Sequence, residues 1–106
     1  MAKDFVNYTK LEQLSLGDRI VDLREKGMKL GEEAGEFQRA MLRFVGAKNT
    51  SKSAHSGDIR LNVLEELCDT IIVSIDIINA VGFSDEEAAD MFEKKLNKWK
   101  SKQEKY

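Results

Sequence analysis

The sequence has no proline, and only one cysteine, one histidine and one tryptophan, in 106 residues. Without proline, no position is excluded from a helix interior by a missing amide hydrogen. The apolar residues are largely Leu, Ile, Val, Met and Ala, a mixture that favours helix over sheet. We therefore expect an all-α protein: a single domain over residues 1–106, built as a small bundle of four to five helices.

Segments that would direct the chain to an oxidising compartment or a membrane are also missing. Cys68 has no second cysteine to pair with, which fits a reducing cytoplasm. Residues 1–10 are polar and charged with no apolar core, so we expect no signal peptide. The most apolar run, residues 70–81, contains Asp76 and Asn79 and is too short to span a bilayer. We expect a cytoplasmic protein with no membrane partner.

No excess of charge of one sign is present. The chain has 17 Lys and Arg against 19 Asp and Glu, interleaved along most of its length, so a nucleic-acid partner is not expected. A domain of this size buries little core by itself, and one predicted helix is apolar on one face and partly apolar on the other. We therefore expect completion by homo-oligomerisation, as a homodimer or homotetramer.

The first half of the chain predicts an arm, a short helix and a long helix. Residues 1–8 have no clear period and predict a loosely ordered arm with Phe5 and Tyr8 as candidate anchors, and residues 10–16 predict a short helix. Apolar residues then recur at steps of three and four, which is typical of an amphipathic helix, with a kink allowed by Gly27. They are Ile20, Leu23, Gly27, Leu30, Ala34, Phe37, Met41 and Phe44.

The second half predicts two further helices after a mobile loop at residues 46–57. Asp58 is a candidate N-cap, and Gly82 a candidate C-terminal stop, for the first of them. Ser84 and Glu87 match the capping box that opens a final helix, whose second half is rich in lysine. The first of these helices has an apolar stripe formed by Leu61, Leu64, Leu67, Cys68, Ile71, Ile75 and Ile78.

Two pairs of acidic residues carry the predicted chemistry. Glu33 and Glu36, and likewise Glu66 and Asp69, are three residues apart, so each pair lies on one face of its helix. Carboxylates that converge from two packed helices repel one another unless a cation lies between them, and oxygen ligands suit a hard ion such as Mg²⁺. The alternative is that these residues are solvated and form surface salt bridges.

The motifs together resemble the all-α nucleoside triphosphate pyrophosphatases, the MazG-like group. The resemblance consists of the Glu-x-x-Glu of GEEAGEF, the Glu-x-x-Asp of EELCDTII, an apolar helix, a Gly-containing turn and a Lys-rich amphipathic helix, over residues 30–102. It implies cleavage of a nucleoside triphosphate between the α and β phosphates, in a dimer or tetramer of helical bundles. It also implies Mg²⁺, with Mn²⁺ as a substitute, bound by Glu33, Glu36, Glu66 and Asp69.

The sequence departs from that group in two places. The spacer between Glu36 and Glu66, 29 residues, is at or beyond the usual upper end. The final helix has Trp99 where many relatives have Asn, and lysines where many have Arg.

For catalysis we expect a carboxylate to orient the attacking water as general base, and either Glu33 or Glu36 is the candidate. No Ser/His pair indicates a covalent intermediate. The candidate substrate-binding residues, each with a plain structural alternative, are Asp76, Asn79, Lys95, Lys98 and Trp99. Asp76 alternatively pairs with a lysine, Asn79 caps a turn, and Trp99 belongs to a core or interface.

Basic residues around the loop offer a lid over the triphosphate, or ordinary surface chemistry: Lys48, Lys52 and Arg60. His55 is alone in this loop and indicates no zinc site. No histidine falls on a predicted helix, so a di-iron carboxylate bundle is excluded. The rival to a hydrolase is a non-catalytic helical module that binds a nucleotide or a protein.

Overall fold

The computed structural model describes residues 5–17, 22–48 and 56–104, and within them every regular element is a helix. The four helices of this part are α1 (Tyr8–Gly17), α2 (Leu23–Lys48), α3 (Ser56–Val81) and α4 (Asp85–Glu104). The all-α prediction is therefore confirmed. No helix in these ranges is long and apolar enough to cross a membrane.

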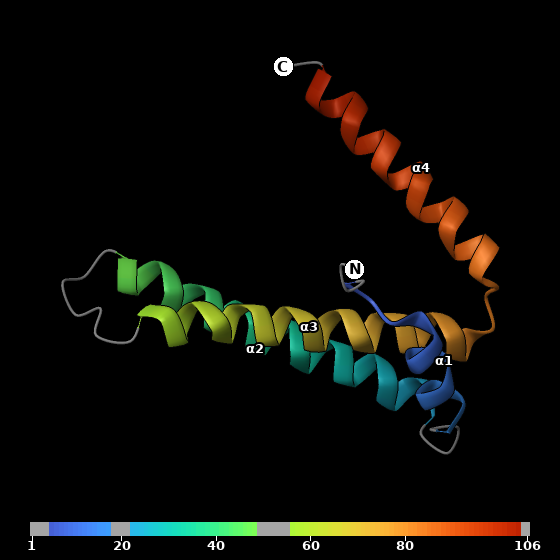
Figure 1. The fold of residues 1–106 in the computed structure, drawn as a ribbon, viewed down its shortest axis with the longest axis horizontal. Helices are drawn as coiled ribbons and strands as arrows, with labels where there is room; N and C mark the ends of the chain where they lie inside the picture. The colour runs from blue at the N-terminus through green and yellow to red at the C-terminus, as the bar shows by residue number, and fades with distance from the viewer. Residues whose placement is uncertain (1–4, 18–21, 49–55, 105–106) are drawn as a thin grey trace, which may run out of the picture.

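The centre of the molecule is an antiparallel pair formed by α2 and α3, with α1 packed against α3 near the α3 C-terminus (Figure 1). After α3 the chain turns, and α4 extends away from this pair instead of lying along it (Figure 1). One chain is thus a helical pair with a short third helix on one side and a projecting fourth.

The face of α2 that packs on α3 follows a regular line. Its three most buried residues, Lys26, Glu33 and Ala40, are seven residues apart, and Ala40 is only 1% exposed. Partly buried Leu30 and Phe37 lie between them, and partly buried Phe44 follows Ala40 one turn further on. These six residues, which we call the contact line, have the alternating four and three spacing of two helices packed side by side. The contact line includes two charged residues that a search for apolar periodicity leaves out.

The N-terminal prediction needs two corrections. The short helix begins at Tyr8, two residues before the predicted start, because Asn7 caps it through a 3.0 Å hydrogen bond from the Lys10 amide to the Asn7 side chain. Neither predicted anchor is buried, since Phe5 is 74% and Tyr8 65% exposed. Residues 1–4 lie outside the described part.

The predicted loop at 46–57 is also shorter than expected. Helix α2 continues through Gly46 to Lys48, and α3 begins at Ser56, so both helices extend into the Ser- and Gly-containing segment; residues 49–55 lie outside the described part. Asp58 consequently lies in the first turn of α3, where its charge favours the helix dipole, instead of at the N-cap. Helix α2 is one unbroken helix that runs through Gly27.

The corner between α3 and α4 is as predicted. Gly82 has a φ of 101°, and the amides of Gly82 and Phe83 donate to the carbonyls of Asn79 and Ile78, the two hydrogen bonds of a Schellman motif. Ser84 and Glu87 then form a reciprocal capping box at 3.0 and 3.1 Å. Residues within a few positions of the turn therefore determine where α3 ends and α4 begins.

Candidate metal centre

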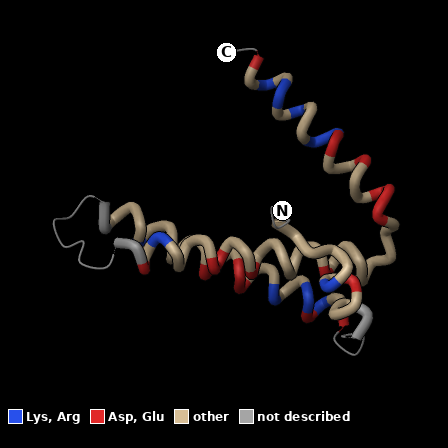
Figure 2. Tube along the Cα trace, in the orientation of Figure 1, with Lys and Arg blue, Asp and Glu red and all other residues tan. Residues whose placement is uncertain are grey.

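Three of the four predicted acidic ligands come together in the middle of the α2–α3 pair. Glu33, Glu66 and Asp69 each offer one carboxylate oxygen, and the three oxygens lie within 4.8 Å of one another. We call these residues the acidic cluster. Figure 2 shows the acidic residues of α2 and α3 gathered along the middle of the pair. The i, i+3 spacing places Glu66 and Asp69 on one face of α3, and the packing of α3 on α2 brings this face to Glu33.

The carboxylates of the acidic cluster are more buried than those of ordinary surface salt bridges. Glu33 is 5% exposed, and its Oε2 atom is shielded from solvent without a hydrogen-bond partner. The Oε2 atom of Glu66 is in the same state. Buried carboxylate oxygens without donors are costly, because burial removes the water that would otherwise solvate them. A plain solvated role does not account for this arrangement.

Glu36, the fourth predicted ligand, lies beside the cluster but outside its 4.8 Å group and is exposed. Glu36 affects Glu66. The pKa of the Glu66 carboxyl is raised above its ordinary value, first by partial burial, and then by the charge of Glu36 and a hydrogen bond with it. The charges of Asp69 and Glu33 act in the same direction. Glu36 therefore lies near Glu66, and the three cluster residues are close enough to share one ion.

A lysine partly neutralises the cluster. The Lys29 ammonium lies 3.0 Å from Glu33 Oε1 and 3.9 Å from Glu32 Oε2, one helical turn or less away on α2. The hydrogen bond and the charge of Glu33 raise the pKa of Lys29, so this side chain is positively charged at neutral pH. Lys29 satisfies one oxygen of Glu33 and leaves Oε2 unpartnered.

The residues of the acidic cluster fit a hard divalent cation. All the donors are carboxylate oxygens, the type that Mg²⁺ and Mn²⁺ accept, and two cluster residues, Glu33 and Glu66, each have a buried oxygen with no partner. The single cysteine lies on α3 next to Leu67 and is not one of the cluster, and no histidine is part of it, so a zinc site is not indicated among the described residues.

A cavity of about 520 Å³ is lined by Lys29, the partner of Glu33, and by Glu32, whereas Glu33, Glu66 and Asp69 are not among its described lining residues. Its walls are formed by the N-terminal half of α2 and by the part of α3 that contains Val73 and Asp76. Asp76 accepts a 2.6 Å hydrogen bond from the buried Lys26 ammonium and another from the Ser15 hydroxyl of α1. Asp76, predicted as a substrate contact or a lysine partner, pairs with Lys26 and connects three helices at the cavity wall.

The remaining predicted substrate residues do not reach the acidic cluster within one chain. Asn79 lies at the C-terminal end of α3, where its carbonyl takes part in the turn at Gly82. Lys95, Lys98 and Trp99 are exposed on α4, whose basic half points away from the α2–α3 pair (Figure 2). Arg60 is exposed on α3; Lys52 and His55 lie outside the described residues, as does the side chain of Lys48.

Lys26 and Lys29 are the site residues that the sequence did not reveal. Each resembles an ordinary surface lysine, because a search for apolar periodicity passes over charged residues. A signal was nevertheless present: the seven-residue spacing that joins Glu33 to Ala40, extended one step toward the N-terminus, places Lys26 in the contact line.

No family model, curated protein or solved structure matches this chain.

Proposed function

We propose that this protein is a divalent-cation-dependent nucleotide pyrophosphohydrolase, which cleaves a nucleoside triphosphate between its α and β phosphates. The observation that carries the proposal is the convergence of Glu33, Glu66 and Asp69 with two buried, unpartnered oxygens. Mg²⁺ is the proposed cofactor and Mn²⁺ its substitute. When bound, the cation would act as a Lewis acid that neutralises phosphate charge.

The residues around the cluster suit separate roles. Glu33, Glu66 and Asp69 would hold the cation, because their oxygens are the closest set. Glu36 suits the role of general base better than Glu33, since it is exposed and lies outside that set. The cavity of about 520 Å³ is within the size range of small-ligand sites and is the proposed nucleotide site.

Release of pyrophosphate tests this proposal. Purified protein is incubated with standard and damaged nucleoside triphosphates in Mg²⁺ or Mn²⁺, and pyrophosphate is detected by a coupled assay. We expect Asp69→Asn and Glu36→Gln to reduce turnover by at least about 100-fold while the helical circular dichroism is retained. Glu65→Gln, an exposed neighbour of Glu66, is the matched control and should keep full activity.

The assay also separates the hydrolase from its rival. A protein that binds a nucleotide with Mg²⁺ in calorimetry, yet releases no pyrophosphate from any substrate, is a non-catalytic binding module. Full activity in both Asp69→Asn and Glu36→Gln would contradict the assignment of the acidic residues even if the activity itself is present.

We further propose that the working form is a homo-oligomer, because one chain leaves too much apolar surface in water. Its accessible surface is 9061 Å², about 3,000 Å² more than a compact monomer of this mass exposes. Large apolar side chains are exposed on α4, where Phe92 is 68% and Trp99 62% exposed. Packing of α4 against a second copy would bury this stripe and is the proposed route by which Lys95, Lys98 and Trp99 reach a nucleotide.

A further inference from the structure

The ion pair between Lys29 and Glu33 joins two side chains in very different surroundings. The side chain of Glu33 is 7% exposed, whereas that of Lys29 is 56% exposed and reaches Glu33 Oε1 from the solvent side. Lysine precedes glutamate by four residues, and this order gives the weaker of the two i, i+4 ion pairs on a helix. The Lys29 ammonium is therefore the replaceable partner of a fixed carboxylate.

Lys29 also lines the neighbouring cavity. Lys26 and Lys29 are the two basic residues among its described lining, and Lys26 is buried and held by Asp76 at 2.6 Å. Lys29 has a flexible four-carbon stem and open space around its half-exposed side chain. It can thus turn from the acidic cluster into the cavity without disturbing the contact line.

We propose that Lys29 is an exchangeable counter-ion: it neutralises Glu33 when no metal is bound, and contacts an anionic phosphate oxygen in the cavity once a divalent cation occupies the acidic cluster. The inference rests on the proposed function, since it assumes a metal at the cluster and a phosphate chain beside it. Its physical basis is charge repulsion: the Lys29 ammonium lies 3.0 Å from Glu33 Oε1, so a cation held at the same carboxylate would be a like charge at close range.

This exchange predicts effects of opposite sign for one substitution. Without its ammonium, Lys29→Met should bind Mg²⁺ alone roughly fivefold more tightly, because the competing ion pair is gone. It should bind an α,β-methylene nucleoside triphosphate, at saturating Mg²⁺, roughly tenfold more weakly, because a charged hydrogen bond to phosphate is lost. A lysine that only stabilises α2 would not move the two affinities in opposite directions.

Isothermal titration calorimetry of the full chain measures both affinities. Arg43→Met is the matched control: it removes an exposed positive charge from the same helix, about 21 Å along the axis from Lys29, and should leave both affinities unchanged. Lys29→Arg keeps the charge and should restore nucleotide binding to within about threefold of the wild type. Circular dichroism checks the fold, and Lys29→Gln replaces Lys29→Met if the latter does not fold.

The outcomes distinguish this inference from the proposed function. Opposite shifts in Lys29→Met support the exchange. If the wild type binds Mg²⁺ and nucleotide, and Lys29→Met either matches it or weakens both affinities, the exchange is wrong while the proposed function stands. If the wild type binds no Mg²⁺ or no nucleotide, the proposed function fails and the exchange fails with it.

Discussion

Glu66 is the carboxyl group whose surroundings most clearly oppose its charge. Its environment combines partial burial with three neighbouring carboxylates, Glu36, Asp69 and Glu33. All of these raise its pKa, so folding without metal brings together charges that the unfolded chain keeps apart. A cluster of this kind lowers the stability of the metal-free protein.

The pH dependence of stability should report this directly. Because the pKa of Glu66 is higher in the folded than in the unfolded protein, the folded state holds more protons between its ordinary value of 4.5 and the raised value. The Glu66 contribution to stability is therefore lost as the pH rises through this window. In EDTA, we expect Glu66→Gln to melt at a higher temperature than the wild type at pH 7 and to lose this advantage near pH 4.

Thermal melts by circular dichroism over pH 4–8 check this prediction, with Glu65→Gln as the exposed neighbouring control. Added Mg²⁺ should raise the melting temperature of the wild type more than that of Glu66→Gln. A wild type that is more stable than Glu66→Gln at neutral pH in EDTA would contradict the prediction.

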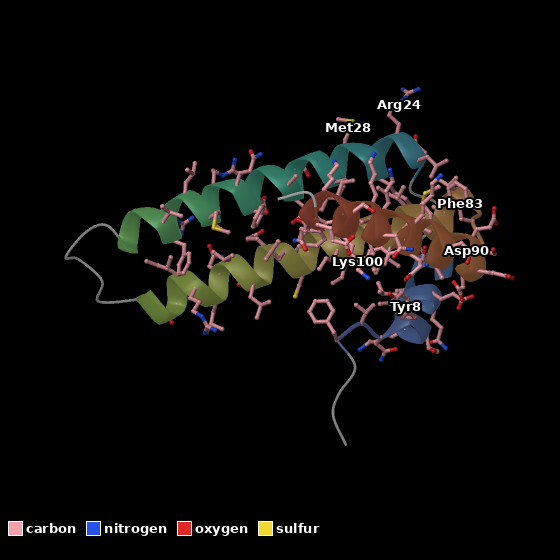
Figure 3. The ribbon with its side chains drawn as sticks, turned by 90° about the horizontal axis from the view of Figure 1, so that it is seen from above. Tyr8, Arg24, Met28, Phe83, Asp90 and Lys100 are labelled. Carbon is pink, nitrogen blue, oxygen red and sulfur yellow. The ribbon has the colours of Figure 1, made fainter. Side chains whose placement is uncertain are left out.

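The Lys26–Asp76 pair is the second residue-scale prediction. The side chains are 6% and 20% exposed and 2.6 Å apart, and Asp76 also accepts a hydrogen bond from Ser15. Asp76→Asn removes the negative charge opposite a buried ammonium, so we expect a loss of about 2 kcal/mol in the free energy of unfolding. Urea denaturation measures it, and Asp90→Asn on exposed α4 (Figure 3) should cost less than about 0.5 kcal/mol. Equal costs would show that the pair does not stabilise the bundle.

At the scale of elements, the α3–α4 corner depends on one backbone conformation. Gly82 has a φ of 101°, in the left-handed region, and the Schellman hydrogen bonds depend on it. The capping box at Ser84 and Glu87 then starts α4 at once, so the direction of α4 is set within a few residues.

Substitution of glycine by alanine should have opposite effects at two sites. Gly82→Ala forces a side chain into the left-handed region and should destabilise the protein by about 1 kcal/mol. Gly46→Ala lies inside α2 with open space around it, so higher helix propensity should stabilise the protein by up to ~1 kcal/mol. Urea denaturation monitored by circular dichroism measures both. Equal effects of the two substitutions would contradict the role given to Gly82.

At the scale of the whole molecule, one chain is too extended for its length. Its radius of gyration is 17.0 Å, against about 13 Å for a compact domain of this size. Helix α4 stands apart from the helical pair and contains no buried residue (Figure 1). In Figure 3, Asp90 and Lys100 mark the two halves of this helix, and Phe83 marks the corner from which it projects.

The proposed oligomer gives a prediction at this scale. We expect light scattering to give at least twice the mass of one chain, and Phe92→Asp to lower it, because a charge on the apolar stripe opposes burial. Asn97→Asp adds the same charge about 140° around α4 from Phe92 and should leave the mass unchanged. A wild type with the mass of one chain would contradict the proposed oligomer. It would also indicate that α4 packs elsewhere in solution.

The sequence alone determined the features that depend on a few neighbouring residues. Helical periodicity, the stop at Gly82, the capping box at Ser84 and the acidic i, i+3 pairs all follow from backbone geometry within one or two turns. For the same local reason the predicted loop was too long: a Ser- and Gly-containing segment resembles a loop, although α2 and α3 each extend into it.

Only the tertiary structure decided which charged residues are buried. Lys26 and Glu33 are withdrawn from solvent because the contact line of α2 passes through them and α3 covers that line, a relation between segments far apart in sequence. The same packing brings Glu66 and Asp69 to Glu33 and leaves Glu36 at the edge. Burial depends on which faces of two helices meet, and no local pattern in either helix specifies that choice.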